Sequence, residues 1–151
     1  MATDINVYAE KFEDGKWQPV PEPRITDYSE GKVIPIELLS EFDWGCRPYH
    51  IFPFLGVIRY GTSKERSIKP IKDRKGLPIN LSTFYRKNFF DDDDYDYECD
   101  FGHSWLTLKE IIDYNWDVQF TEQSAYFEKL GKLLSQFGSP ENVRIIYWFD
   151  S

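Results

Sequence analysis

The chain has 151 residues, a formal net charge of −8 and a pI near 4.8, and 41% of its residues are hydrophobic. This size and composition predict one domain with a sizeable core, while the acidic charge disfavours general nucleic-acid binding and docking on an anionic membrane. The sequence has no run of 18 apolar residues, no secretory signal and only two cysteines, so we expect a cytoplasmic protein that does not span a membrane.

The first twenty residues predict a β-hairpin. Apolar side chains alternate with other residues over 5–12, which indicates a strand. Asp14-Gly15 is typical of a tight hairpin turn, and Trp17–Val20 is the expected return strand. Three prolines then interrupt regular structure, so we expect residues 21–46 to be irregular apart from one short turn at Ile36–Phe42.

The middle of the chain is less regular. Apolar residues near helical spacing predict a helix over Tyr49–Arg59, although Pro53 suits only its first turn or a kink. Residues 60–104 contain several Gly and Pro and no long periodic run, so we expect a long irregular segment there, with an acidic loop at 91–100. A connection of that length inside a compact domain is usually functional or mobile.

The last third has clearer signals. Thr107 followed by Glu110 is a capping box, which predicts a helix from 108 to about 115. A second helix is expected over Glu122–Phe137, with Gly138 as its stop. The buried residues of the two helices are expected to be Leu108, Ile111 and Ile112, and Tyr126, Phe127, Leu130, Leu133, Leu134 and Phe137.

Residues Val143–Phe149 are almost continuously apolar, which favours a central strand. A chain that opens and closes with strands and has helices between them indicates the α+β class. We therefore predict a single domain over residues 1–151, with a small sheet that includes the N- and C-terminal strands and packs against two or three helices. The first and last strands could pair with each other.

Charge is divided sharply in the middle of the sequence. Residues 59–87 contain nine Lys or Arg and two acids, whereas residues 91–100 contain seven acids and no base. Outside 59–87 the chain has a net charge of −15. The basic stretch suggests a site for an anion, but segment 59–100 as a whole is neutral, which points to a few specific arginines rather than to the charge runs.

Catalytic and metal-binding patterns are weak. His50 and His103 are the only histidines, which excludes a His-rich zinc site, and the Asp run lacks the spacing of an EF-hand. His103 and Ser104 are neighbours, but adjacent residues seldom achieve the geometry of a nucleophile and its base. We expect no catalytic residue, no metal site and no cofactor.

Anion binding fits the residues better. Arginine binds phosphate through its planar fork, and aromatic rings can stack on a base. The candidate cations are Arg47, Arg59, Arg66, Lys69, Lys72, Arg74, Lys75, Arg86 and Lys87. Tyr49, Tyr60, Phe84, Tyr85 and Trp105 are near them in sequence. A solvated loop with its lysines in water is the competing interpretation.

Five pieces of the chain stand out as a set, in order along nearly its whole length. They are residues 4–10 with 15–17, 47–52 with 57–59, 74–78, 103–110 and 143–150. Together these pieces resemble a family of small uncharacterised proteins from phages and prophages. The chain departs from the family at Pro53, where the family's helix usually has a small residue. The family's segment equivalent to 87–100 varies in length, which argues against an essential role for the Asp run.

The resemblance implies no established activity. It implies a phage context and the cytoplasm of a bacterial host, where small acidic proteins often block host defence, in some cases by sequestering nucleotide signals. Our leading hypothesis is a non-enzymatic binder of a phosphate-bearing nucleotide. Its expected ligand-binding residues are Arg47, Tyr49, Arg59, Arg74, His103, Ser104 and Trp105.

Two alternatives stay open. One is an acidic inhibitor that binds a host protein, and the other is a metal-dependent nucleotide hydrolase. The sequence does not determine the oligomeric state, and a homo-oligomer with a pocket between subunits is one arrangement to consider, because one small domain has limited depth for enclosing a ligand.

Overall fold

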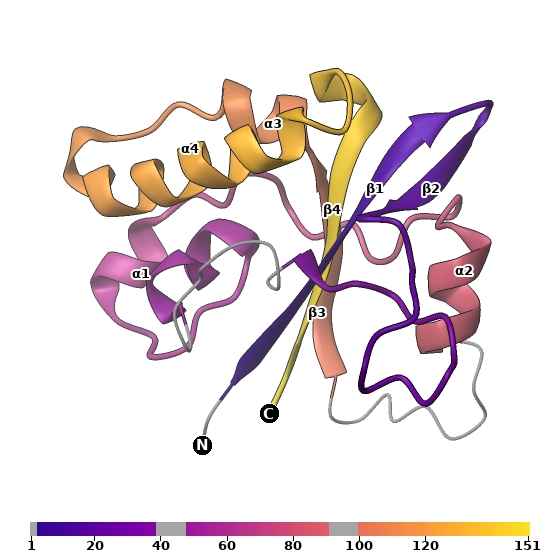
Figure 1. Ribbon diagram of the computed structural model, residues 1–151. Coiled ribbons are helices and arrows are strands. Elements are labelled where there is room, and N and C mark those ends of the chain that lie inside the picture. Colours follow the sequence, from indigo (N-terminus) through magenta and orange to yellow (C-terminus); the bar gives the residue numbers. More distant parts are fainter. Residues whose placement is uncertain (1–2, 39–47, 91–99) are drawn as a thin grey trace.

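The computed structural model describes residues 3–38, 48–90 and 100–151. It shows one α+β domain in which an antiparallel sheet separates helices on its two faces (Figure 1). The sheet order is β2-β1-β4-β3. Its strands are β1 (Asp4–Glu13), β2 (Lys16–Val20), β3 (Asp100–Thr107) and β4 (Val143–Asp150).

The predicted hairpin is confirmed. Strand β1 pairs with β2 in an antiparallel register that places Glu13 opposite Lys16. The two residues between them, Asp14 and Gly15, have φ angles of 56° and 77°. These positive values are those of the turn that best matches the twist of the flanking strands, and Gly15 adopts its value without a steric penalty.

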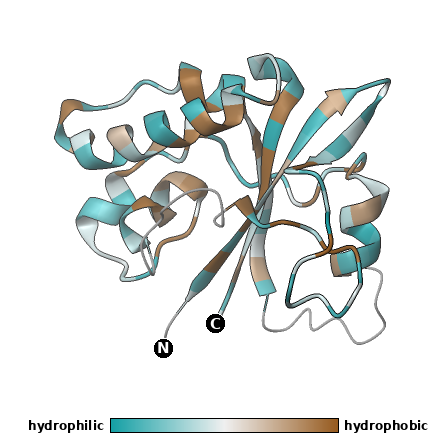
Figure 2. Cartoon of the chain, viewed as in Figure 1, coloured by the Kyte–Doolittle hydropathy of each residue, from teal (hydrophilic) through white to brown (hydrophobic). Residues whose placement is uncertain are grey.

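Strand β4 is central, as its apolar run predicted, and it pairs with β1, so the two ends of the described chain form the middle of the sheet. Because side chains alternate across a strand, β4 contributes to both faces. In Figure 2, brown stretches of β4 are interrupted by a hydrophilic band and by pale stretches. Ile145, Tyr147 and Phe149 belong to the larger core cluster, and Ile146 and Trp148 belong to the smaller one.

The larger core lies between the sheet and most of the helices (Figure 1). The expected helix over Tyr49–Arg59 is instead a 3-10 helix, η2, over Tyr49–Leu55. It ends at Gly56, which has a φ of 89° and whose amide donates to the carbonyls of Phe52 and Pro53. Pro53 has no amide hydrogen, so a longer regular helix through it would lose a hydrogen bond.

The capping box at Thr107 is confirmed, and it begins α3 (Leu108–Asp113). Leu108 and Ile111 are buried as predicted, but Ile112 is 58% exposed, so its predicted burial is wrong. A helix of six residues presents one narrow side to the sheet, and Ile112 lies outside that side.

The second predicted helix is α4 (Thr121–Ser135). Phe127, Leu130 and Leu134 are buried, and the other three predicted residues pack against the core while partly exposed. The helix ends two residues earlier than expected, and Gly138 is not among the residues with a positive φ. The short 3-10 helices η4 (Val118–Phe120) and η5 (Pro140–Asn142) precede α4 and β4.

The prediction that residues 60–104 are irregular is wrong for much of the segment. It contains α1 (Ser63–Ser67), α2 (Thr83–Tyr85), one π-helical turn η3 (Arg86–Phe90), and most of β3. The pair α2–η3 covers the smaller core on the opposite face of the sheet (Figure 1). The predicted acidic loop falls outside the described residues except for Asp100, the first residue of β3.

Strand β3 was missed because its register is irregular at a glycine. The pairing with β4 shifts between Phe101 and Ser104. Gly102, inside the shift, has a φ of 69°, and a Cβ there would lie 2.9 Å from Cδ2 of Phe149. A glycine is therefore required by both backbone conformation and space, and it breaks the simple alternation by which a strand is recognised.

Candidate ligand-binding site

The predicted ligand-binding residues that the structure describes do not form one cluster. Tyr49 and Arg59 make one group. Ser104 and Trp105 contact Lys75, the neighbour of Arg74, in a second group, and His103 packs on Trp148. Arg47 lies outside the described residues.

Tyr49 and Arg59 anchor η2 to the start of β1. The Arg59 guanidinium lies 4.2 Å from the centre of the Tyr49 ring and 5.4 Å from that of Tyr60. Arg59 Nη1 donates to Oγ1 of Thr3, and the Tyr49 hydroxyl accepts from the Thr3 amide at 3.3 Å. Glu65 accepts from the Arg59 amide at 3.1 Å. These contacts give both residues structural partners.

The second group surrounds Lys75. The backbone amide of Lys75 donates to Oγ of Ser104 at 3.0 Å, and Lys75 Nζ lies 3.8 Å from the centre of the Trp105 ring. Nζ also donates to both carboxylate oxygens of Glu110, at 2.7 and 2.9 Å. The preceding Arg74 passes close to Gly56, where a Cβ would lie 3.3 Å from Arg74 Cγ. Residues 74 and 75 are therefore attached to β3, α3 and η2.

Glu110 has two structural roles. It completes the capping box of α3 with Thr107 and forms the ion pair with Lys75. Partial burial acts to raise its pKa, but hydrogen bonds from Lys75 and Thr107 outweigh it, and the pKa lies below its ordinary value. The carboxylate is thus held ionised at neutral pH.

His103 packs into the smaller core. Its ring is stacked on Trp148, with centres 6.2 Å apart and planes 10° apart, and meets Phe90 edge-on at 5.9 Å. Burial lowers its pKa, and the charge of Asp100 opposes that shift. Because adjacent strand residues point to opposite faces, His103 and Ser104 do not act on a common ligand.

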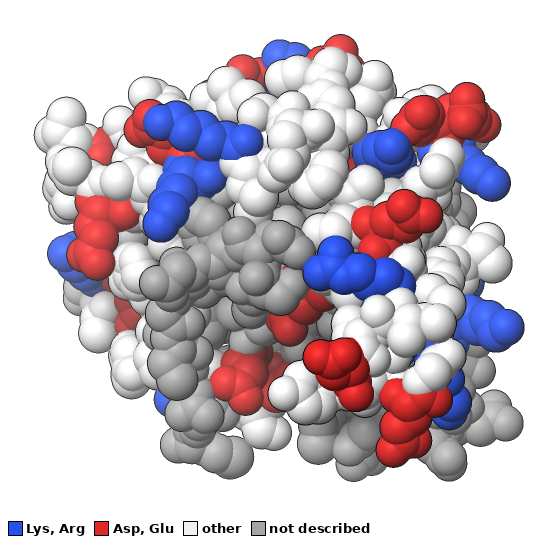
Figure 3. Space-filling view, viewed as in Figure 1, with Lys and Arg blue, Asp and Glu red and all other residues white. Residues whose placement is uncertain are grey.

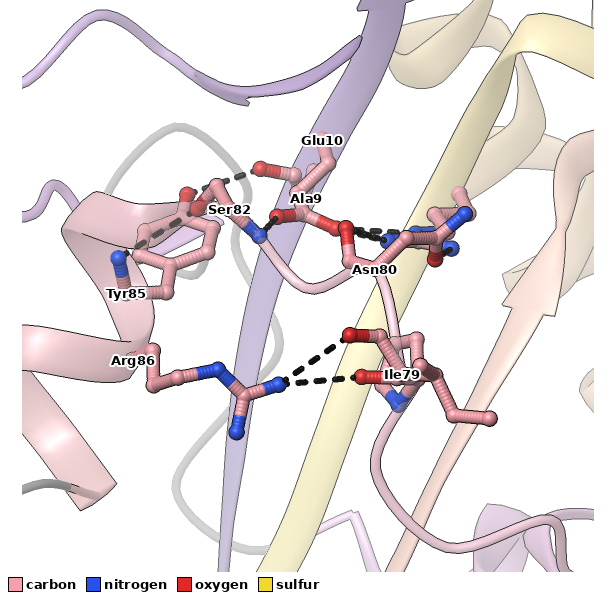
Figure 4. Close-up of polar contacts among 9 residues, drawn as sticks. Ala9, Glu10, Ile79, Asn80, Ser82, Tyr85 and Arg86 are labelled. Atoms are coloured by element: carbon pink, nitrogen blue, oxygen red, sulfur yellow. Dashed lines mark hydrogen bonds and ion pairs between the residues drawn. The ribbon is translucent and has the colours of Figure 1, made fainter.

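The structure contains a buried ion pair, Glu10 with Arg144, that was not among the predicted site residues. Glu10 and Arg144 are 0% and 1% exposed, and Arg144 Nη2 lies 2.7 Å from Oε1 of Glu10. The other carboxylate oxygen accepts from the Ser82 amide at 2.7 Å, and Arg144 Nη1 donates to Oδ1 of Asn80 at 2.9 Å. Figure 4 shows Glu10, Asn80 and Ser82 gathered where the 78–82 segment crosses the sheet.

Arg144 also lies between aromatic rings. Its guanidinium carbon is 3.9 Å from the centre of the Trp17 ring and 5.2 Å from that of Trp105. Burial acts to lower the pKa of Arg144, while the neighbouring Glu10 acts to raise it. The sequence carried a signal for this pair, since a charged residue inside an apolar central strand must find a buried partner. Glu10 is on the polar side of the adjacent strand, directly opposite Arg144.

A cavity of about 580 Å³ lies between residues 67–72, α3 and the 114–120 segment; we call it the α3 pocket. Its volume is within the range of small-molecule sites. Lys69 and Lys72, from the basic stretch, line it together with Tyr114 and Asn115. The Tyr114 hydroxyl donates to the Lys69 carbonyl at 2.5 Å, which ties the two sides together.

The charges of the α3 pocket are partly paired. Lys109 is 2.6 Å from Asp113, and Glu110 is paired with Lys75. Asp117 accepts from the Gln119 amide at 3.1 Å as the cap of η4. Among the ion pairs of the described residues, none involves Lys69 or Lys72. These two lysines were among the candidate cations of the sequence but were not among the seven selected residues.

Within residues 3–38, 48–90 and 100–151, no group of three or more His, Cys, Asp or Glu is arranged to hold a metal ion. None of the helices found in those ranges is long and apolar enough to cross a membrane.

Comparison of the chain with protein-family models, curated proteins and solved structures gives no match in any of the three. The resemblance to phage proteins therefore stays a prediction.

Proposed function

We propose that this protein binds a phosphate-bearing nucleotide in the α3 pocket without converting it. The observation that carries the proposal is the placement of Lys69 and Lys72, without a carboxylate partner among the described residues, on a cavity large enough for such a ligand. A lysine ammonium is a compact charge with three donors, which suits phosphate oxygens.

Aromatic and amide groups of the same cavity suit the remainder of a nucleotide. Tyr114 is half-buried, Phe120 is buried, and both line the pocket. A base stacked on an aromatic ring gains about 1–3 kcal/mol. Asn115 and Gln119 line the pocket too, and their side-chain amides offer donors and acceptors to a base edge or a ribose.

Two of the seven residues selected from the sequence support this pocket from outside. Ser104 and Trp105 hold Lys75, and Lys75 holds Glu110, which lines the cavity. We assign Arg59 and Tyr49 to fold stability instead, because their described contacts join η2 to β1.

The described residues on one face give less support to an acidic inhibitor of a host protein. Figure 3 shows their basic and acidic side chains interleaved on that face, without a broad area of one sign among them. If the phage resemblance is correct, a binder without chemistry would act by sequestering a nucleotide signal of the host.

Calorimetry with cyclic AMP, cyclic di-GMP, ATP, GTP and inorganic phosphate tests the proposal. The variant Lys69→Gln/Lys72→Gln is expected to lose about a hundredfold in affinity for the best ligand, since each lysine contributes a charge-assisted hydrogen bond. The matched control is Lys32→Gln/Lys87→Gln, which removes the same charge at two exposed positions away from the pocket. Equal losses in both variants, or no binding at millimolar ligand, would end the proposal.

The hydrolase alternative is separated by the state of the ligand. After incubation with Mg²⁺ or Mn²⁺ and heat denaturation of the protein, the nucleotide is expected to be recovered intact by chromatography. Recovery of a cleaved product would favour the hydrolase.

A further inference from the structure

A second cavity lies on the opposite face of the sheet, beside the buried ion pair. It has a volume of about 400 Å³ and lies between the β1–β2 hairpin and residues 80–84; we call it the hairpin pocket. Its aromatic residues are Phe12, Trp17 and Phe84, and its polar residues include Gln18, Asn80 and Thr83. Lys16 is its one charged residue among the described residues that line it.

One wall of the hairpin pocket, formed by Asn80 and Ser82, is tied to the sheet by hydrogen bonds. Asn80 receives hydrogen bonds from Arg144 at both its side-chain and backbone oxygens, at 2.9 and 3.3 Å. Ser82 is bound to Glu10, and Arg86 Nη2 donates to the carbonyls of Pro78 and Ile79 at 3.3 and 3.5 Å (Figure 4). Because the Asn80 oxygen is occupied, its amide hydrogens are the groups left to donate to a ligand.

The aromatic residues of the hairpin pocket are also positioned by the Glu10–Arg144 ion pair. The Arg144 guanidinium covers the Trp17 ring at 3.9 Å, and the Phe12 ring meets Trp17 with centres 5.4 Å apart. Phe12 stays 41% exposed although it is a large apolar residue. An exposed aromatic beside fixed, neutral hydrogen-bonding groups is an arrangement that favours recognition over stability.

The lining indicates the class of ligand. Asn80 offers its amide hydrogens, and Gln18 offers its side-chain oxygen, because Gln18 Nε2 already donates to the Glu13 carbonyl at 2.8 Å. The Thr83 hydroxyl and the hydroxyls of a sugar both donate and accept hydrogen bonds. Aromatic rings offer flat apolar surface to the C–H faces of a sugar ring. A phosphate would meet only Lys16, so a charged ligand is poorly matched. We propose that the hairpin pocket binds a neutral saccharide, independently of the nucleotide proposed for the α3 pocket.

Saturation-transfer NMR tests this proposal. The probes are glucose, galactose, mannose and N-acetylglucosamine, with a β-linked and an α-linked trisaccharide of each, at millimolar concentration. At least one is expected to receive saturation from the protein. The variant Thr83→Arg, which places a long side chain in the pocket, is expected to reduce its affinity about tenfold or more. Thr26→Arg, on a loop outside the pocket, is expected to leave it unchanged.

Folding of each variant is checked by thermal unfolding. If Thr83→Arg does not fold, Phe12→Ala supplies the test, because it removes an exposed ring from an edge of the pocket and is expected to weaken binding in the same way. The absence of saturation transfer for every sugar, or unchanged binding in the variant tested, would overturn the proposal. Lys69→Gln/Lys72→Gln should bind the sugar normally, so failure of one site is distinguishable from failure of the other.

Discussion

Two ion pairs meet the same tryptophan, and they differ in almost every respect that sets their energy. Arg144 and Lys75 both contact the ring of Trp105, at 5.2 and 3.8 Å from its centre. The Arg144–Glu10 pair is almost completely buried. The Lys75–Glu110 pair keeps 24% and 20% of its side-chain surface exposed.

The difference is one of solvent. Breaking a buried pair leaves an unpaired charge in a poorly solvated site and costs about 3–5 kcal/mol, whereas an exposed pair contributes about 0–1 kcal/mol. The buried Arg144–Glu10 pair also holds the 78–82 segment. The partly exposed Lys75–Glu110 pair joins α3 to the basic stretch beside the α3 pocket. We therefore expect the first to dominate stability and the second to position a site.

The largest expected effect is that of Arg144→Met. It leaves Glu10 buried without its cation, and we expect the free energy of unfolding to fall by about 3–5 kcal/mol. Urea denaturation followed by circular dichroism measures this change.

The matched variant is Glu10→Leu/Arg144→Met, which removes both charges. It is expected to recover part of the loss, because no unpaired charge remains. The cycle is completed by Glu10→Leu alone. If the double variant loses as much stability as Arg144→Met and Glu10→Leu lose together, the pair is not coupled and the comparison loses its basis.

The capping box supplies an intermediate effect. Thr107→Ala removes the side chain that accepts from the Glu110 amide at 3.1 Å, and we expect a loss of about 1 kcal/mol in unfolding free energy. Thr62→Ala removes the same motif from α1, which has no buried residue. Thr62→Ala should therefore lower the unfolding free energy by less than Thr107→Ala. An equal or larger loss for Thr62→Ala would contradict the view that the α3 cap matters more because α3 packs against the core.

A smaller effect is expected for Lys75→Met. The pair with Glu110 is partly exposed, so unfolding free energy should fall by at most about 1 kcal/mol. Much of that difference should disappear in about 1 M salt, where the Debye length is about 3 Å. A loss as large as that of Arg144→Met, or one insensitive to salt, would mean that the two pairs do not differ as described.

The smallest effect is the pH dependence of the exposed pair. The pKa of Glu110 is depressed in the folded protein, so its contribution is complete above the pKa of the unfolded chain and is lost as the pH falls through the folded value. The stability difference between the native chain and Lys75→Met should therefore shrink from pH 7 to about pH 3, below the ordinary Glu value. A stability difference that grows on acidification would contradict a lowered pKa for Glu110 in the folded protein.

Local signals in the sequence predicted local structure well. Asp14-Gly15 predicted the hairpin and Thr107 with Glu110 predicted the start of α3, because the physical cause of each feature lies within a few residues. The apolar run of β4 predicted its central place. Strand β3 was not predicted because Gly102 interrupts its pattern. The glycine is required by its contact with Phe149, which is distant in the sequence.

The candidate site was harder to predict, because its residues are brought together by contacts between positions far apart in the sequence. Glu10 and Arg144 are 134 residues apart, and the Tyr114 hydroxyl meets the Lys69 carbonyl across 45 residues. The basic stretch was recognised from its composition, but the lysines that face a cavity could not be separated from those in water. That separation needs the position of α3, which only the fold supplies.

The most direct test of the central claim is a crystal structure of the protein with the tightest-binding nucleotide of the calorimetric panel. The account predicts that the phosphate lies within hydrogen-bonding distance of Lys69 and Lys72 and that the nucleotide is chemically intact. A phosphate held elsewhere, with both lysines in solvent, would contradict it.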